Sequence, residues 1–357
     1  MLYNYHHYSN IFLILDYYGH ELYYLHFYIF YQKLPKYIKD FLFLILFKMV
    51  KDKRKVLFSD SIQLEGHQAE INSGKFSHNG EYFCSAGNDK IINIWEVFDK
   101  KCRNVNSIIH AHSSPILEIC WSNDDDYIAS CSVDKRVTLW DIYNGNYVIK
   151  YKEHDNFIYS LDFYDNLICS VGEDCSLIIN DIRTKLKINS YNHKYQLTTC
   201  KFLKNDSIFF GGIDNQIYKY DLKKGEIDKN FILTGHSDTI TGIDISHNNK
   251  YLLSNSMDNS LIIWEIQKTG NNLFKKLMGN KHGNEKNLLR CKWSNDDNLV
   301  SCGSADKIVH IWDAKAGYII KNIYGHNGCI NEVDFNSLSS NIISSVSNDC
   351  TSIIGYF

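Results

Sequence analysis

The chain has 357 residues, of which 44% are hydrophobic, so it is long enough to bury a large core. Its formal net charge of −3 argues against general, nonspecific binding of nucleic acid. The 11 cysteines are an odd number without a Cys-x-x-Cys pair, which favours reduced thiols in a cytosolic or nuclear protein over a disulfide-rich secreted one.

The first 48 residues differ in composition from the rest, being rich in Tyr, Phe, Ile and Leu. The apolar run at residues 41–47 is shorter than the about 20 residues of a membrane-spanning helix, and charged residues interrupt residues 11–31. We therefore expect no membrane span, and the features of a secretory signal are also lacking. Met49 begins a polar stretch typical of a soluble protein. We predict that residues 1–48 are an N-terminal extension, either an artefact of gene prediction or a disordered tail, and that residues 49–357 form one domain.

From residue 67 onward, a His, an Asp and a Trp recur at a fixed spacing. In each set a small residue precedes the His, an acidic residue follows the Trp, and a Ser stands four residues before the Asp. The three complete sets are His67, Ser85, Asp89 and Trp95; His112, Ser130, Asp134 and Trp140; and His236, Ser254, Asp258 and Trp264. A fixed interval of this kind indicates a chain built from repeated units.

Four incomplete units follow the same register, which makes seven in all. Unit three has His154, Ser170 and Asp174, but Asn180 at the Trp position, and unit seven has His326, Ser345 and Asp349, but Gly355 at the Trp position. Unit six has His282, Asp306 and Trp312, with Cys302 in place of Ser. Unit four has Asp214, with Phe210 in place of Ser, Tyr220 in place of Trp and His193 only roughly at the His position. We expect the hydrogen bonds among the repeated residues to stabilise these four units less than the three complete ones.

Each unit is predicted to contain four short strands. In unit two they cover residues 116–121, 127–132, 136–142 and 147–151, because β-branched and aromatic residues alternate there with turns rich in Asn, Asp and Gly. Asp125, in the first of those turns, is expected to be exposed. The last unit ends at Phe357, just after its third strand, so we expect residues 56–64 to supply the missing strand.

The repeat, with Gly-His near its start and Trp-Asp near its end, resembles the WD40 repeat of about 40–45 residues. The resemblance implies an all-β fold, a seven-bladed WD40 β-propeller whose ring is closed by an N-terminal strand. One four-stranded sheet cannot bury both of its faces alone, whereas stacked sheets bury them against each other.

The repeated Ser, His and Asp also have the composition of a hydrolase triad. Seven copies of one triad are better explained as a structural device, because a buried Asp needs hydrogen-bond partners and a neutral His offers one donor and one acceptor. We call the Ser, His, Asp and Trp of one unit a staple. The sequence also lacks a P-loop, a glycine-rich dinucleotide motif and a cluster of zinc ligands, so we predict no cofactor, no metal and no enzymatic activity.

A propeller presents rigid loops around a central channel, and a binding scaffold is therefore the expected function. One residue of each inner strand should point to the mouth of this channel and is a candidate for partner binding: Ser73, Glu118, Ser160, Thr199, Gly242, Arg290 and Glu332. Residues just before each turn Asp should lie nearby: Asn88, Val133, Glu173, Ile213, Met257, Ala305 and Asn348. This mixed set suits a peptide or protein surface better than RNA phosphates.

Several stretches of the second half are more specific than the general repeat. They are residues 211–215, 251–259, 304–306 and 330–333, and above all Glu285-Lys286-Asn287-Leu288-Leu289-Arg290-Cys291, which repeat packing does not require. Over about residues 56–357 the chain resembles the family of the WD-repeat subunit of the U5 small nuclear ribonucleoprotein (U5 snRNP). The resemblance implies a nuclear, non-enzymatic spliceosome subunit acting in pre-mRNA splicing. It also implies binding to the large U5 scaffold protein and other spliceosomal proteins, with any contact to RNA being indirect.

A second interpretation concerns a different class of complex. Asn180-Asp181-Ile182-Arg183 resembles the Trp-Asp-x-Arg box of WD40 substrate receptors of cullin ubiquitin ligases, with Asn in place of Trp. A histone-tail or signalling adaptor is a third alternative. Both remain open on the sequence alone.

Overall fold

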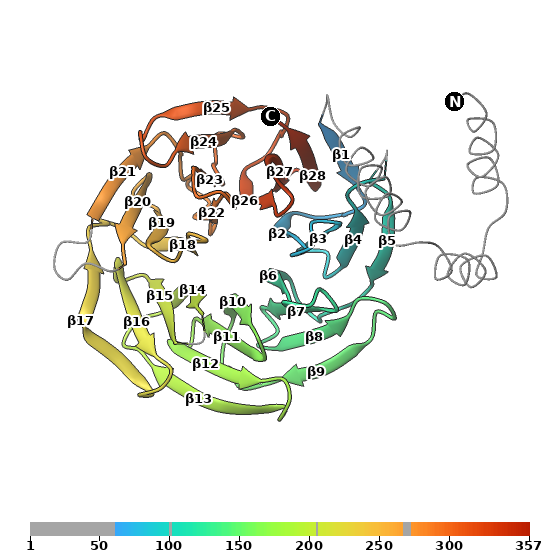
Figure 1. Ribbon diagram of the computed structural model, residues 1–357. Helices are drawn as coiled ribbons and strands as arrows, with labels where there is room; N and C mark the ends of the chain where they lie inside the picture. The colour runs from blue at the N-terminus through green and yellow to red at the C-terminus, as the bar shows by residue number, and fades with distance from the viewer. Residues whose placement is uncertain (1–60, 100–101, 205, 267–272) are drawn as a thin grey trace, which may run out of the picture. The chain divides into compact units, whose positions relative to one another are not determined.

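The computed structural model describes residues 61–99, 102–204, 206–266 and 273–357. In these parts of the chain all regular structure is β-strand, arranged as seven four-stranded antiparallel sheets around a central axis (Figure 1). We call each sheet a blade. The predicted seven-bladed propeller is therefore confirmed, whereas the predicted extension at residues 1–48 lies outside the described residues.

In each blade the strands follow one another from the central channel to the outer edge. Blade 1 contains β2 (Ile71–Phe76), β3 (Tyr82–Gly87), β4 (Ile92–Glu96) and β5 (Asn104–Ile108); blade 2 contains β6 (Ile116–Trp121), β7 (Tyr127–Ser132), β8 (Val137–Asp141) and β9 (Tyr147–Tyr151). Blade 3 contains β10 (Ile158–Tyr164), β11 (Leu167–Gly172), β12 (Ser176–Asp181) and β13 (Leu186–Asn192); blade 4 contains β14 (Leu197–Leu203), β15 (Ser207–Gly212), β16 (Gln216–Asp221) and β17 (Glu226–Thr234). Blade 5 contains β18 (Ile240–Ile245), β19 (Tyr251–Ser256), β20 (Ser260–Glu265) and β21 (Leu273–Met278); blade 6 contains β22 (Cys291–Trp293), β23 (Leu299–Cys302), β24 (Val309–Asp313) and β25 (Ile319–Ile323).

Blade 7 is assembled from both ends of the described chain. Its strands β26 (Ile330–Asn336), β27 (Ser339–Ser347) and β28 (Thr351–Tyr356) are completed by β1 (Ile62–Glu65), which pairs antiparallel with β28. Leu64 of β1 faces Ser352 and is buried. Closure by an N-terminal strand is therefore confirmed for residues 62–65, while residues 56–60 of the predicted segment lie outside the described residues.

The hydrophobic core is divided among the junctions between blades. In the first junction, Ile92 and Ile94 of blade 1 pack with Ile116, Ile119 and Trp140 of blade 2. Each of the other junctions has a comparable cluster of buried residues drawn from two neighbouring blades. Burial of apolar side chains between sheets thus supplies the favourable free energy that one sheet alone lacks.

The other sequence-based expectations concern cysteines, membranes and metals. All 11 cysteines are free thiols, and only Cys175 and Cys350 are partly exposed. No helix in the described parts of the chain has the length and hydrophobicity to cross a membrane. The same parts contain no group of His, Cys, Asp and Glu side chains arranged to hold a metal ion.

Candidate functional site

The staples of blades 1, 2 and 5 share one hydrogen-bonding pattern. In blade 2, His112 Nδ1 lies 3.0 Å from the Asp134 carboxylate and Nε2 lies 2.7 Å from Ser130 Oγ. Trp140 Nε1 donates to the same hydroxyl oxygen at 2.8 Å. Because a carboxylate only accepts, the His112 proton resides on Nδ1, so Nε2 accepts the Ser130 proton. The equivalent distances are 2.7, 2.8 and 3.0 Å for His67, Ser85, Asp89 and Trp95, and 3.0, 2.7 and 2.8 Å for His236, Ser254, Asp258 and Trp264.

The environment of the staples is that of a structural element. Burial by itself would raise the pKa of Asp134, but hydrogen bonds from His112 and Ser113 outweigh it and hold the pKa below its usual range. Ser130 is fully buried, and its oxygen already bonds two side chains. A nucleophilic serine must be reachable by substrate, so this geometry does not provide a hydrolase site.

Blades 3 and 7 retain the His, Asp and Ser contacts without a Trp. His154 bonds Asp174 at 2.9 Å and Ser170 at 2.8 Å, and His326 bonds Asp349 and Ser345, both at 2.9 Å. An additional hydroxyl reinforces each carboxylate, because Ser176 donates to Asp174 and Thr351 to Asp349, both at 2.6 Å. These two blades are thus closer to the complete staples than the sequence indicated.

Blade 4 replaces the staple with an aromatic cluster. His193, which the sequence placed only roughly, contacts Asp214 through Nε2 at 3.1 Å, and the Tyr218 hydroxyl donates to the same carboxylate at 2.7 Å. The ring of Tyr218 stacks on Phe210 at 5.5 Å and lies 4.7 Å from that of His193. The missing serine oxygen leaves His193 Nδ1 buried without a hydrogen-bond partner among the described residues.

In blade 6 the sequence register at His282 is wrong. Both ring nitrogens of His282 are buried without a partner in the described parts of the chain, and Asp306 is instead bonded by His310 Nε2 at 3.0 Å. Gly279-Asn280 occupies the place of Gly-His, since a Cβ at Gly279 would lie 3.5 Å from the Trp312 ring, much as Gly66 approaches Trp95. Blade 6 has additional residues between Gly279-Asn280 and β22, and these led to the wrong assignment of His282 as the His of the repeat.

A second correction concerns Asp125. It is 7% exposed rather than a free turn residue, because its carboxylate accepts the backbone N–H groups of His78 and Asn79, both at 2.7 Å. The same arrangement joins blades 5 and 6, where Asp297 accepts from His247 and Asn248. This loop carboxylate therefore connects neighbouring blades.

The predicted channel-mouth residues line the channel but are buried. The exposed fraction is at most 7% for each of Ser73, Glu118, Ser160, Thr199, Arg290 and Glu332. Side-chain oxygens of four of them accept backbone N–H groups of the next blade: Glu332 from Gly74 at 2.9 Å, and Ser73, Glu118 and Ser160 from Ile119, Leu161 and Cys200, each at 3.2 Å. We expected surfaces open to a partner, and the structure instead uses these side chains to join blades.

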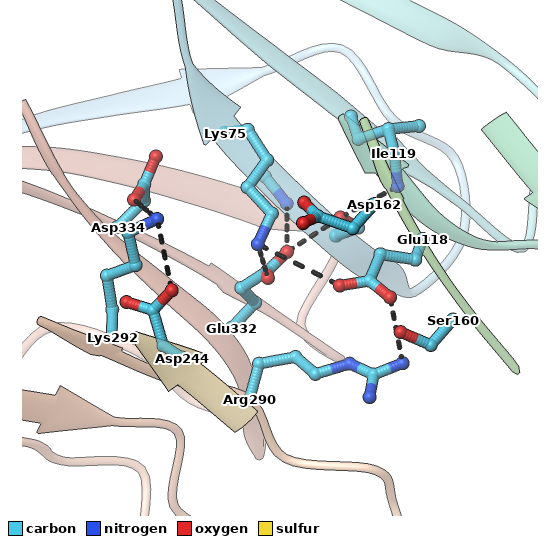
Figure 2. Close-up of polar contacts among 12 residues, drawn as sticks. Lys75, Glu118, Ile119, Ser160, Asp162, Asp244, Arg290, Lys292, Glu332 and Asp334 are labelled. Carbon is cyan, nitrogen blue, oxygen red and sulfur yellow. Dashed lines mark hydrogen bonds and ion pairs between the residues drawn. The ribbon is translucent and has the colours of Figure 1, made fainter. Parts of the chain in front are cut away.

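Arg290 connects more blades than the other residues of this ring, and Figure 2 shows its contact with Glu118. From blade 6 its guanidinium donates to the carbonyls of Thr198 at 3.0 Å, Thr241 at 2.7 Å and Tyr159 at 2.5 Å, and it lies 3.3 Å from the Glu118 carboxylate. At Gly242 a Cβ would come within 3.0 Å of the Arg290 backbone, which explains the glycine in this ring.

A second ring of charges lies two residues further along each inner strand, and the sequence reasoning missed it (Figure 2). Around the channel the residues are Lys75, Cys120, Asp162, Lys201, Asp244, Lys292 and Asp334. Lys and Asp alternate from blade to blade, with one interruption at Cys120. The period of two in a strand places these side chains on the channel side, below the first ring. This two-residue period is the sequence feature from which the second ring could have been predicted.

Every charge of this second ring has a partner. Lys201 Nζ lies 2.6 Å from Asp162, and Lys292 Nζ lies 3.4 Å from Asp334 and 3.9 Å from Asp244. Lys75 Nζ contacts Glu332. Burial alone would lower the pKa of Lys75, but the carboxylates of Glu332 and Glu118 outweigh it, so the pKa is raised.

The ring of paired charges surrounds a cavity of about 320 Å³. Its charged side chains pair with one another across blades, and burial raises the pKa of the Cys120 and Cys291 thiols in its lining, which keeps them protonated. The described residues provide no metal-binding group there. The charged side chains in this region can therefore hold the ring rigid, and the side chains accessible to solvent lie around it.

The residues before each turn Asp form such an exposed rim. Asn88, Val133, Glu173, Ile213, Met257, Ala305 and Asn348 are all at least partly exposed. Apolar side chains follow one another on the rim at blades 3 and 4, where Phe157, Tyr195 and Ile213 are 37%, 40% and 42% exposed. Backbone bonds from Glu173 to Phe157 and from Ile213 to Gln196 tie these segments to the rim.

The Asp181–Arg183 pair belongs to a local turn. Arg183 donates to the Asp181 carboxylate through Nε at 3.2 Å and a terminal nitrogen at 2.9 Å, and Asn180 is buried. The turn explains this pattern without a ubiquitin-ligase adaptor.

Comparison with known proteins agrees with this architecture. The WD domain, G-beta repeat family matches residues 59–96, 102–141, 228–265, 275–313 and 317–354. These ranges leave out β9, all of blade 3 and the first three strands of blade 4. The chain is similar to the U5 small nuclear ribonucleoprotein 40 kDa proteins of Dictyostelium discoideum (37% identity over 82% of this chain and 83% of the relative) and Homo sapiens (36%, 80% and 80%). It is also similar to the pre-mRNA-splicing factor cwf17 of Schizosaccharomyces pombe (34%, 83% and 87%). The chain belongs to the WD40-repeat family and, within it, to the family of the U5 small nuclear ribonucleoprotein 40 kDa proteins.

Proposed function

We propose that this protein is a non-catalytic scaffold subunit of the U5 snRNP and of the spliceosome, acting in the nucleus in pre-mRNA splicing. The observation that supports the proposal is the identity of 36–37% to two U5 small nuclear ribonucleoprotein 40 kDa proteins and of 34% to a pre-mRNA-splicing factor, each over 80–83% of this chain. The direct partner in this proposal is the large scaffold protein of the U5 particle, and contact with RNA is indirect.

The geometry supports a binding role over an enzymatic one. The Ser, His and Asp side chains that could suggest catalysis are buried and bonded to each other, and the channel charges are paired. By contrast, the rim at blades 3 and 4 exposes three large apolar side chains on segments held by backbone hydrogen bonds. Apolar and aromatic groups on a rigid frame are the typical centre of a protein interface.

The test is affinity purification of the tagged full chain from nuclear extract. We expect U5 RNA and the large scaffold protein to co-purify. Recovery of a cullin adaptor without spliceosomal RNA would overturn the proposal.

A pair of variants tests the rim. Ile213→Asp places a charge among the rim residues and should reduce recovery of the scaffold protein, because a desolvated carboxylate disfavours an apolar contact. The matched control is Leu186→Asp on β13, where the side chain is 65% exposed at the outer edge. Both variants should retain the thermal midpoint of the unaltered protein. Equal recovery with both would refute the rim as the contact surface.

A further inference from the structure

A cavity of about 400 Å³ lies at the junction of blades 1 and 2, beside the staple of blade 2. It is separate from the channel and shares no lining residue with the channel cavity. Lys90 enters it from the turn of blade 1, and Arg136, Thr138 and Lys150 enter it from blade 2. The connecting segment between the two blades, residues 110–113, completes the lining. We call this cavity the basic pocket.

The charges of the basic pocket do not balance. Its lining includes Lys90, Arg136 and Lys150 against one carboxylate, that of Asp134. None of these three cations has a carboxylate partner within the described parts of the chain, and Lys150 Nζ lies over aromatic rings, 4.0 Å from the centroid of Tyr147 and 5.7 Å from that of Trp140. The Asp134 carboxylate is already surrounded by donors, since it bonds His112, the Ser113 backbone at 3.1 Å and the Arg136 backbone at 3.2 Å. A cavity with three cations that lack a carboxylate partner, in a chain of net negative charge, favours an anionic ligand.

Thr138 supplies a second, independent observation. It lines the basic pocket and is 1% exposed, yet its Oγ1 has no hydrogen-bond partner among the described residues. At the matching position of blade 1, Asn93 bonds the staple His67 at 3.1 Å, and in blade 6 His310 bonds Asp306. A buried hydroxyl without a partner is unusual and indicates a missing acceptor or donor at this site.

Blade 5 shows that the pocket is not a by-product of the staple. Its staple is complete, with the same contacts as blade 2. At the matching positions, however, Ser260 replaces Arg136 and donates to Asp258, Ile262 replaces Thr138, and Lys276 lies 3.9 Å from Asp258. The turn residue of the preceding blade is Asn215 rather than a lysine. The staple of blade 5 thus forms without a basic residue at the positions of Lys90 and Arg136, which leaves these two residues free for another role.

We propose that the basic pocket binds the phosphate of a phosphorylated serine or threonine side chain in a partner protein. A phosphomonoester carries between one and two negative charges and three acceptor oxygens at neutral pH. Arg136 offers two parallel N–H donors to such a group, Lys90 and Lys150 offset its charge, and the Thr138 hydroxyl gains an acceptor.

The observations favour a single phosphate over an RNA strand. Single-stranded RNA is usually held in a groove that follows several phosphates, with bases stacked on successive aromatic side chains. Here the unpaired cations meet in one cavity of limited volume, and the overall charge of the chain is negative. A phosphorylated side chain fits this confinement better.

The experiment measures binding of a fluorescein-labelled peptide, Gly-Ala-Gly-phosphoserine-Gly-Ala-Gly, to the purified full chain by fluorescence anisotropy. The unphosphorylated peptide and a labelled ten-nucleotide uridine RNA serve as comparison probes. We expect saturable binding of the phosphopeptide, competition by inorganic phosphate, and at least about tenfold weaker binding of both comparison probes. The unphosphorylated peptide has no phosphate, and the RNA offers only phosphodiesters, which carry less charge and fewer free oxygens than a phosphomonoester.

Variants locate the binding in the pocket. Arg136→Ser, which installs the residue found at the matching position of blade 5, should weaken phosphopeptide binding about tenfold, and Lys150→Ala should also weaken it. Lys135→Ala is the matched control, because Lys135 is a neighbouring exposed lysine whose Nζ donates to the Asp155 carbonyl outside the pocket. An unchanged thermal midpoint would show that each variant is folded.

Three outcomes would overturn the proposal. The first is an absence of phosphopeptide binding, and the second is binding that Arg136→Ser and Lys150→Ala leave unchanged. The third is sensitivity to these variants for the RNA but not for the phosphopeptide. Because the assay uses purified protein, its result does not depend on whether the chain co-purifies with U5 RNA.

Discussion

Blades 2 and 4 fix the same turn of the repeat by different means. In blade 2, polar atoms of His112, Asp134, Ser130 and Trp140 form a closed set of hydrogen bonds. In blade 4 the Asp remains, but the serine oxygen and the indole are replaced by the side chains of Phe210 and Tyr220, both fully buried. The turn carboxylate is thus the shared element, and the rest of the staple can be exchanged for aromatic packing.

The exchange changes which contacts support the blade. His193 and Tyr218 still bond Asp214, and their rings pack with Phe210 and Tyr191. Aromatic pairs of this kind contribute about 0.5–1.5 kcal/mol each beyond their area. One nitrogen of His193 and one oxygen of Asp214 lack partners among the described residues. Blade 4 therefore depends more on packing, and blade 2 more on hydrogen bonds.

The largest expected effect comes from restoring the staple serine in blade 4. Phe210→Ser should lower the free energy of unfolding by roughly 3–5 kcal/mol, because removing a fully buried ring leaves a cavity that one new hydrogen bond does not fill. Urea unfolding followed by circular dichroism measures the change, with the exposed Leu186→Ser as control. A loss below about 1 kcal/mol would mean that the staple re-forms and that packing is not what supports blade 4.

Removal of the turn carboxylate should lower the free energy of unfolding by different amounts in blades 2 and 4. Asp134→Ala is expected to cost about 1–3 kcal/mol, because it leaves the buried Nδ1 donor of His112 unpaired and removes the acceptor of the Ser113 N–H. Asp214→Ala should cost less because the aromatic cluster remains. Thermal and urea unfolding of both variants provide the measurement. The control is Asp155→Ala, which removes an exposed carboxylate. Equal losses in blades 2 and 4 would contradict the distinction.

In blade 6 the buried His282 should make the stability of the protein depend on pH. Burial lowers the pKa of His282 to about 4, against about 6.5 in the unfolded chain. Below pH 6.5 the unfolded chain therefore binds the extra proton first, so stability is lost as the pH falls from about 6.5 to about 4, by about 1–3 kcal/mol. His282→Asn should flatten the dependence of the unfolding midpoint in this window, whereas His247→Asn at an exposed site should not. A slope unchanged by His282→Asn would refute the assignment.

The smallest effect concerns the unpaired hydroxyl in blade 2. Thr138→Val keeps the side-chain shape and removes a buried oxygen without a partner, so it should leave stability unchanged or raise it by up to about 1 kcal/mol. Thr241→Val is the matched control and should destabilise, because that hydroxyl donates to the Leu289 carbonyl at 2.8 Å. Differential scanning calorimetry resolves the two directions. Destabilisation by Thr138→Val would indicate that the hydroxyl has a partner in the free protein.

The sequence predicted the repeat architecture closely because its signals are local. In blade 2, β6, β7 and β9 have the predicted bounds, and β8 begins at Val137 and ends at Asp141, one residue inside the predicted range at each end. The strands follow from alternating β-branched residues, and the turns follow from Asn, Asp and Gly. The His, Asp and Ser contacts were also visible as fixed intervals within one unit.

The errors arose where contacts cross from one blade to another. The exposure expected for Asp125 fails because its partners, His78 and Asn79, belong to the preceding blade. The exposure expected for Glu332 and Glu118 fails because next-blade backbone groups cover them. Blade 6 was misaligned because Asn280 stands where other units have His, and inserted residues follow it.

The sequence by itself determined the number of units, the four strands of each and the Ser, His and Asp contacts of blades 1, 2, 3, 5 and 7, because these depend on periodicity and on residues a short distance apart. Only the tertiary structure decided which side chains remain accessible. The alternating Lys and Asp ring exists only when seven inner strands meet around one channel, and the basic pocket exists only where two blades meet. Charge pairing and burial depend on distances between strands far apart in the chain, and those distances are set by the closure of the ring.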